Sequence, residues 1–178
     1  MTVFQIEKGT SMATAKKVAP RSAGAQDAVA LLTADHREVK SLFEKYEKLA
    51  QNQGNAGDRQ ALAETICDML IVHTTIEEDI FYPAARKATQ DDELLDEARV
   101  EHAAAKNLIA EIKEMSPKDD LYDAKVKVLG EQIDHHVEEE EGEMFPETRK
   151  SDMDLAELGA RMLARKNQLM SELGESAS

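Results

Sequence analysis

Several kinds of residue are scarce in this sequence of 178 amino acids, and each scarcity excludes a class of protein. The single cysteine, Cys67, cannot form a disulfide within the chain, which is typical of a reducing compartment. With only 8 glycines and 4 prolines, helices are favoured over sheets. No apolar run is long enough for a membrane-spanning helix or a signal peptide. We therefore expect a helical, cytoplasmic protein.

Basic side chains are also scarce, because 22 lysines and arginines face 36 aspartates and glutamates and leave a net charge of -14. Nucleic-acid binding requires clustered basic side chains, and an anionic membrane surface repels an acidic protein. We expect neither partner, and nothing in the sequence indicates a protein partner. Residues 1–26 are mildly basic and rich in Ala, Ser and Thr. We interpret them as a disordered arm, with a transit peptide as the alternative.

Four long segments follow this arm, and each carries apolar residues at alternating spacings of three and four. Such a stripe is typical of bundle helices. The pattern predicts an all-α protein, an up-down-up-down four-helix bundle whose helices cover approximately residues 27–51, 58–88, 91–115 and 121–147. Asp58 is a plausible N-cap of the second helix. Pro83 is expected to bend that helix, or loosen its hydrogen bonding, near Asp79.

A fifth amphipathic helix is expected over residues 152–173. We expect it to pack against the bundle, with a contact between two copies of the chain as the alternative. The sequence then divides into a disordered arm, a bundle, and a C-terminal helix with a tail, at residues 1–26, 27–150 and 151–178.

One motif occurs twice, as HTTIEEDIFYP at residues 73–83 and as HVEEEEGEMFP at residues 136–146. Each copy places a histidine and a glutamate four residues apart, which puts both side chains on the same face of a helix. Neutral imidazole and carboxylate are ligands that suit divalent metals of the first transition series. The repeat therefore predicts metal ligands on two helices.

Each of the four apolar stripes contains one histidine near its middle: His36, His73, His102 and His136. Their distances from the helix ends bring all four imidazoles to one level of the bundle. Burying them with two carboxylates and no counter-charge would cost several kcal/mol for each uncompensated charge. Two metal ions would remove that cost. The simplest assignment gives one ion His36 and His73 and the other His102 and His136, with Glu77 and Glu140 as bridges.

A competing pair, His135 and Glu139, has the same spacing. The repeat favours His136 and Glu140, because only they preserve the distance to the proline and the apolar stripe. We expect His135 to face outward and the acidic run from Glu138 onward to form mostly a solvated face. Glu78 and Glu141 are candidates for hydrogen-bonding the ligands. Three aromatic residues near the motif are expected to pack in the core rather than form a gas pocket: Phe81, Tyr82 and Phe145.

On these residues the chain resembles the hemerythrin-like family, the HHE cation-binding domains, over approximately residues 27–150. The shared pattern is His36, His73-x-x-x-Glu77, His102 and His136-x-x-x-Glu140. The resemblance implies a four-helix bundle that holds a non-haem di-iron centre, with an oxo or hydroxo bridge, and binds oxygen or related small molecules. The nitrogen and oxygen ligands alone would equally accept manganese or zinc.

The chain departs from the oxygen-carrying members of that family at Lys106. Those members have a fifth histidine there, four residues after the histidine of the third helix. We expect Lys106 to extend to solvent, with a hydrogen bond to a metal-bound oxygen as the alternative. The resemblance then favours binding, sensing or detoxification of O2, NO or peroxide over reversible oxygen carriage.

Two other functions stay open from the sequence. One is an enzyme on the same metals: a ferroxidase, a peroxide-decomposing protein or an iron store. The other is a helical interaction module with a structural metal or none. We favour a protein that binds metal and small ligands over a dedicated enzyme.

Overall fold

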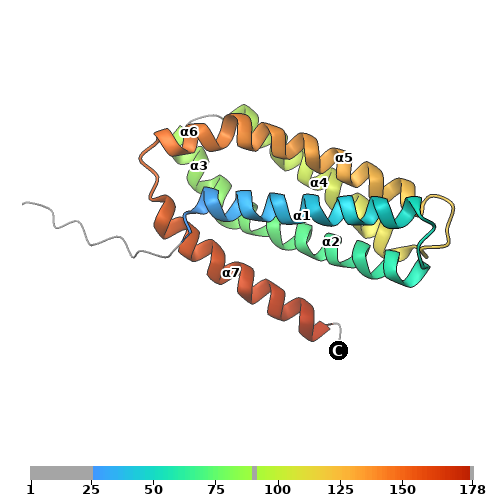
Figure 1. Cartoon of the computed structure of the whole chain (residues 1–178). Helices are drawn as coiled ribbons and strands as arrows, with labels where there is room; N and C mark the ends of the chain where they lie inside the picture. The colour runs from blue at the N-terminus through green and yellow to red at the C-terminus, as the bar shows by residue number, and fades with distance from the viewer. Residues whose placement is uncertain (1–25, 90–91, 177–178) are drawn as a thin grey trace, which may run out of the picture.

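Four long antiparallel helices form the body of the protein, as the sequence predicts (Figure 1). The computed structural model describes residues 26–89 and 92–176, so the predicted arm lies almost entirely outside the described residues. Within these ranges every regular element is helical. Helix α1 packs on α2 and α5, and α4 packs on α2 and α5. The long helices are α1 (Ala28–Gln51), α2 (Ala56–Ile76), α4 (Asp92–Glu114) and α5 (Tyr122–Glu139).

Helices α2 and α5 each continue through a π-helical turn into a short helix. Glu77–Phe81 (η1) joins α2 to α3 (Tyr82–Thr89), and Glu140–Met144 (η2) joins α5 to α6 (Phe145–Lys150). In each turn the N–H of the residue after it donates to the glutamate carbonyl five residues earlier. The following proline lacks an N–H, and its ring crowds the carbonyl four residues before it. The predicted bend near Asp79 therefore takes the form of a wider turn.

The predicted start of the second helix was wrong by two residues. Helix α2 begins at Ala56, and the side chain of Asn55 accepts a hydrogen bond from the Gly57 N–H at 2.7 Å. Asp58 lies in the first turn instead. The preceding turn is tight, because Gln53 has a φ of 52° and a Cβ on Gly54 would lie 2.4 Å from a Leu49 methyl. The chain thus reverses early enough for Asn55 to become the cap.

The apolar core of the described residues consists of two clusters, one toward each end of the bundle. Leu32, Ile76 and Met144 belong to the cluster at the proline end, and Leu70 and Ile109 belong to the other. Cys67 is buried in the second cluster, and burial raises the pKa of its thiol to about 11. The four predicted histidines and Glu140 lie in sequence between the helix segments that build the two clusters, and Glu77 directly follows Ile76 of the first cluster. A polar layer thus separates two apolar ones.

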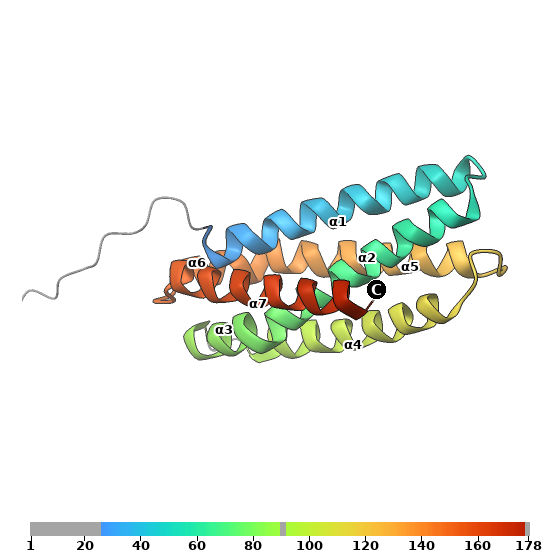
Figure 2. The same cartoon turned by 90° about the horizontal axis from the view of Figure 1, so that it is seen from below.

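The C-terminal helix α7 (Leu155–Ser176) packs across α1 and α2, as Figure 2 shows. It buries Leu158 and Met162 against the cluster at the proline end. The approach is close, because a Cβ on Gly159 would lie 2.4 Å from the Gln26 carbonyl oxygen. Helix α2 therefore packs against α7 as well as against α1 and α4, and it buries more of its surface than a single apolar stripe predicts. Among the described residues, no helix is long and apolar enough to cross a membrane.

Candidate metal centre

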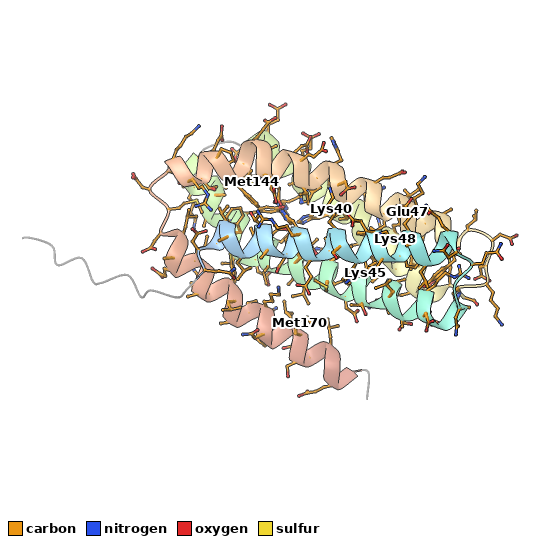
Figure 3. The ribbon with its side chains drawn as sticks, viewed as in Figure 1. Lys40, Lys45, Glu47, Lys48, Met144 and Met170 are labelled. Carbon is orange, nitrogen blue, oxygen red and sulfur yellow. The ribbon has the colours of Figure 1, made fainter. Side chains whose placement is uncertain are left out.

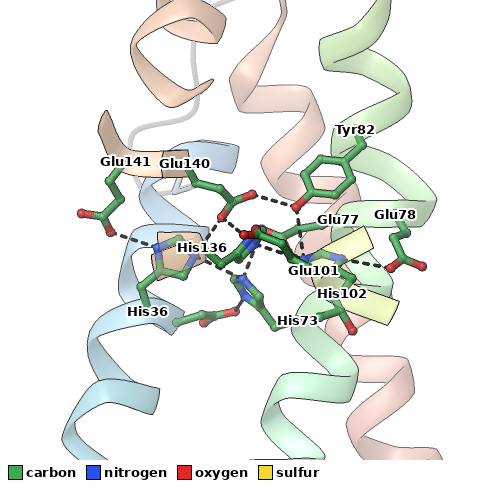
Figure 4. A network of polar contacts seen from close by, with 12 residues as sticks. His36, His73, Glu77, Glu78, Tyr82, Glu101, His102, His136, Glu140 and Glu141 are labelled. Atoms are coloured by element: carbon green, nitrogen blue, oxygen red, sulfur yellow. Dashed lines mark hydrogen bonds and ion pairs between the residues drawn. The ribbon is translucent and has the colours of Figure 1, made fainter. Parts of the chain in front are cut away.

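The six residues that the sequence singles out converge in the polar layer (Figure 4). The Nε2 atoms of His36 and His73 lie 3.2 Å apart, and those of His102 and His136 lie 3.1 Å apart. Each pair comes from two neighbouring helices, α1 with α2 and α4 with α5. The four imidazoles are at most 8% exposed. The predicted pairing of the histidines is therefore also their pairing in space.

Two buried carboxylates lie between the histidine pairs. Glu77 places Oε1 3.1 Å from the His73 Nε2 and Oε2 3.4 Å from the His102 Nε2. Glu140 places Oε2 3.2 Å from the His36 Nε2 and 3.6 Å from the His136 Nε2. Each carboxylate thus reaches one histidine of each pair, which is the arrangement that a bridging ligand requires.

Every histidine of the layer turns its Nδ1 toward an acidic side chain. The Nδ1 of His36 lies 2.9 Å from Oε1 of Glu141, and that of His73 lies 3.6 Å from Oδ2 of Asp35. The Nδ1 of His102 lies 3.0 Å from Oε1 of Glu78, and that of His136 lies 2.8 Å from Oε2 of Glu101. Such a carboxylate places the ring proton on Nδ1 when the imidazole is neutral. The Nε2 lone pairs are then free to coordinate an ion in the polar layer.

Two of these four carboxylates were expected, and two were missed. Glu78 and Glu141 follow the motif glutamates and had been named as hydrogen-bonding candidates. Asp35 and Glu101 each precede a histidine, but each contacts the histidine of the neighbouring helix. The available signal was the repeat itself, since Asp35-His36 and Glu101-His102 occupy equivalent positions in the two halves.

Electrostatics in the layer favour ionised carboxylates. Burial opposes both ionisation of Glu77 and protonation of His73, but their mutual attraction outweighs it. With Asp35 adding to the effect, the pKa of His73 rises to about 10, and that of Glu77 falls well below its usual value. Burial also opposes ionisation of Asp35, yet His73 and Lys166 keep its pKa lowered. Coordination of an ion by His73 must therefore displace a proton.

The donor set fits a pair of metal ions. Both oxygens of Glu77 and Oε2 of Glu140 are buried without a hydrogen-bond partner, and each lies near an imidazole Nε2 atom. Buried polar atoms without partners are costly in a folded protein. Transition metals hold nitrogen and oxygen ligands at about 2.0–2.2 Å, which places neighbouring ligand atoms roughly 3–4 Å apart. The donor atoms fall into two such groups that share Glu77: His36, His73, Glu77 and Glu140, and Glu77, His102 and His136.

His135 lies outside the layer, as expected. Its side chain is 62% exposed, and its Nε2 lies 3.4 Å from Glu139 and 3.7 Å from Glu101. These three residues form a third cluster of donor atoms, but at the surface, where acidic groups commonly gather without an ion. The repeat thus favoured the pair that is buried, His136 and Glu140, over the pair that includes the exposed His135.

Lys106 reaches the surface, where 37% of its side chain is exposed, but its ammonium group also donates to both oxygens of Glu78 at 2.7 Å. This ion pair was not predicted. Glu78 in turn faces the His102 Nδ1. Burial opposes ionisation of Glu78, but Lys106 and His102 keep the pKa of its carboxyl lowered. Lys106 therefore acts on His102 through Glu78.

Tyr82 packs in the core as expected, but the contacts of its hydroxyl were not predicted. Its hydroxyl donates to Oε1 of Glu140 at 2.9 Å and lies 3.2 Å from the His102 Nε2. Burial and the nearby Glu140 raise the pKa of Tyr82 well above its usual value, so the proton stays on the hydroxyl. The equivalent Phe145 stacks on His36 and has no hydroxyl to offer. The two halves of the layer therefore differ.

Comparison with known proteins identifies the family. The family model of the Hemerythrin HHE cation binding domain matches residues 27–148. The uncharacterized proteins Rv2633c of Mycobacterium tuberculosis and Mb2666c of Mycobacterium bovis are each 26% identical over 142 residues, which cover 78% of this chain and 84% of the relative. A crystal structure of a Hemerythrin HHE cation binding domain-containing protein, the Rv2633c homolog from Mycobacterium kansasii, has a TM-score of 0.69 at 24% identity. That match covers 83% of this chain and 89% of the other, and it shows the fold.

The described residues form a helical bundle whose buried imidazoles and carboxylates could hold metal ions. The matched residues include all six predicted ligands. The chain belongs to the family of hemerythrin HHE cation-binding domains, and its class of activity is metal binding.

Proposed function

We propose that this chain is a non-haem di-iron protein that binds O2, NO or peroxide. One observation carries the proposal: four Nε2 atoms and two carboxylates meet in a buried layer, while every Nδ1 faces an acidic side chain. His36 and His73 would hold one ion, His102 and His136 the other, and Glu77 and Glu140 would bridge them. When bound, two iron ions supply redox chemistry and coordination positions open to a small ligand.

Iron is proposed on the family resemblance, because the donor set also suits manganese and zinc. The side chains of the layer act on the ions by position and charge. The four acidic partners orient the imidazoles and make them more basic ligands. The two apolar clusters keep bulk water away from the layer.

Lys106 supports binding, sensing or detoxification over reversible oxygen carriage. Its ammonium is bound by Glu78 and therefore leaves the second ion one nitrogen ligand short of the oxygen carriers. The proposed test is anaerobic loading with Fe(II), followed by optical spectra with O2, NO and peroxide in turn. We expect two irons per chain and a stoichiometric NO adduct. A slowly decaying oxygen adduct would contradict the argument against carriage.

A second candidate function is peroxide decomposition, and Tyr82 favours it. Its hydroxyl stays protonated between Glu140 and His102, where it could donate a hydrogen bond to a small ligand on the second ion. A binding protein would consume about one peroxide per site, whereas an enzyme would consume many. Oxygen release from excess peroxide, lost in Tyr82→Phe with metal content unchanged, would establish the enzymatic function.

The acidic partners of the histidines give a further prediction. Glu101→Gln is expected to lower metal affinity by about 10- to 100-fold, because an amide cannot support the His136 imidazole as a carboxylate does. Competition with a coloured chelator measures the affinity. Glu97→Gln, one turn earlier on the exposed face of α4, is the matched control. Equal affinities in the two variants would contradict a role for Glu101 in holding His136.

A further inference from the structure

A cavity of about 120 Å³ lies against the proposed metal centre. All four imidazoles of the polar layer line it, whereas Glu77, Glu140 and Tyr82 do not. The cavity therefore meets the layer on its imidazole side, opposite the tyrosine. At its outer end it is bordered by Lys166 and Met170 of α7.

The cavity walls are mainly apolar. Val39, Leu70, Val72 and Ile133 lie along it, and they come from α1, α2 and α5. Of the charged residues that border the cavity, Lys166 and Asp35 are paired with each other and Glu38 is exposed, while the aliphatic walls offer no hydrogen bonds to replace the hydration of a charged molecule. Apolar cavities of about 150 Å³ in other proteins take up benzene or xenon. The space thus suits small uncharged molecules.

The two α7 residues at the outer end differ in how firmly they are held. Lys166 forms an ion pair with Asp35, whose other oxygen faces the His73 Nδ1. Met170 lies one turn further along α7, and 45% of it is exposed (Figure 3). A methionine side chain is unbranched and changes rotamer easily. Lys166 therefore fixes the helix over the cavity, while Met170 is the part that can move.

We propose that Met170 controls the access of small uncharged molecules to the metal centre and limits their size. The proposal rests on the proposed function, since it needs a centre that binds such molecules. Helix α7 lies beyond the residues that match the family model, so this control is an addition to the shared domain. The Lys166–Asp35 ion pair sets the distance between Met170 and the bundle.

A second depression also reaches the layer and provides the competing route. It lies between α1 and α5 and touches His36, but charged side chains border it, including Lys40 and Glu138. Gly142 borders the same groove, and a Cβ added there would meet no atom within 4 Å. A large side chain at Gly142 can therefore fill the groove without disturbing the cavity under α7.

The kinetic test is the rate of NO binding to the full-length Fe(II) protein, measured by stopped-flow absorbance. Met170→Trp should slow binding by about tenfold or more, and Met170→Ala should accelerate it. Leu163→Trp is the matched control, because Leu163 lies on the same helix, is also 45% exposed and does not line the cavity. It should bind NO at the wild-type rate, as should Gly142→Trp. Circular dichroism and iron content confirm that each variant is folded and loaded.

Two results would overturn the proposal. Wild-type rates in both Met170 variants would show that the side chain does not control access. A slow Gly142→Trp variant beside a normal Met170→Trp variant would place the route between α1 and α5. Should Met170→Trp fail to fold, the rate in Met170→Ala decides alone.

Xenon provides a readout that does not depend on NO chemistry. Crystals of the metal-loaded chain under xenon pressure should show the gas between α1 and α2, next to Leu70. Xenon in the cavity without any NO adduct would reject the proposed function and leave the cavity intact. No xenon in the cavity beside a normal NO adduct would reject the inference and leave the proposed function standing.

Discussion

Replacing Glu140 with alanine is expected to lower bound metal from about two ions per chain to one or fewer, measured by elemental analysis after anaerobic iron loading. The reason is its position, because one carboxylate oxygen lies near the Nε2 of both His36 and His136. Its loss removes a negative charge and a ligand atom from both halves of the layer. Four neutral imidazoles and Glu77 alone would then face the charge of two cations.

The neighbouring residue supplies the control. Glu139 is 26% exposed in its side chain and contacts the exposed His135 at the same helical spacing. Glu139→Ala should therefore keep the full metal content. The two variants change neighbouring residues, so they compare the glutamate of the polar layer with the one that contacts the exposed His135. Metal loss in Glu139→Ala, or two ions retained in Glu140→Ala, would contradict the ligand assignment.

Removal of the metal is expected to lower the thermal midpoint by roughly 15–30 °C, since each tightly bound ion contributes about 4 kcal/mol and a domain of this size shifts about 2–4 °C per kcal/mol. Without cations the layer keeps four buried imidazoles beside two buried carboxylates, and several of their atoms have no partner. Thermal unfolding followed by circular dichroism, before and after chelation, measures the difference.

His135→Ala provides the control for this second prediction. Its side chain is exposed and outside the polar layer, so the variant should show the same difference between the loaded and chelated forms. Returning the metal should restore the original midpoint. An unchanged midpoint after complete removal of the metal would show that the ions do not contribute to folding stability.

The sequence predicted the helices and the convergence of the six residues because both depend on periodicity along single helices. Helix α4 is the clearest case, since its six buried residues follow the predicted alternation of three and four: Leu95, Ala98, His102, Ala105, Ile109 and Ile112. The duplication supplied the rest, because it selected His136 over His135. These signals are local, and one helix at a time suffices to find them.

The contacts that were missed all join different helices. Tyr82 reaches Glu140 and His102, Asp35 reaches His73, and Lys106 reaches Glu78. Each depends on how two helices are rotated and shifted relative to one another, which a stripe on one helix does not specify. The partners of these residues are set by the packing angle between the helices.

The predicted start of α2 was wrong for a different reason. Asn55 and Asp58 are both good caps, and they lie three residues apart. Which one begins the helix depends on where the preceding turn reverses the chain, and Gln53 in a left-handed conformation places that point early.

The π-helical turns also determine which aromatic side chains pack against the polar layer. Each one winds an additional residue into the helix directly after a ligand glutamate, which rotates everything beyond it by about 100° around the axis. That rotation brings the ring of Tyr82 over His102 and the ring of Phe145 over His36. In a regular helix the same rings would point along another side of the bundle. One extra residue in each half therefore decides that an aromatic ring packs on one histidine of each pair.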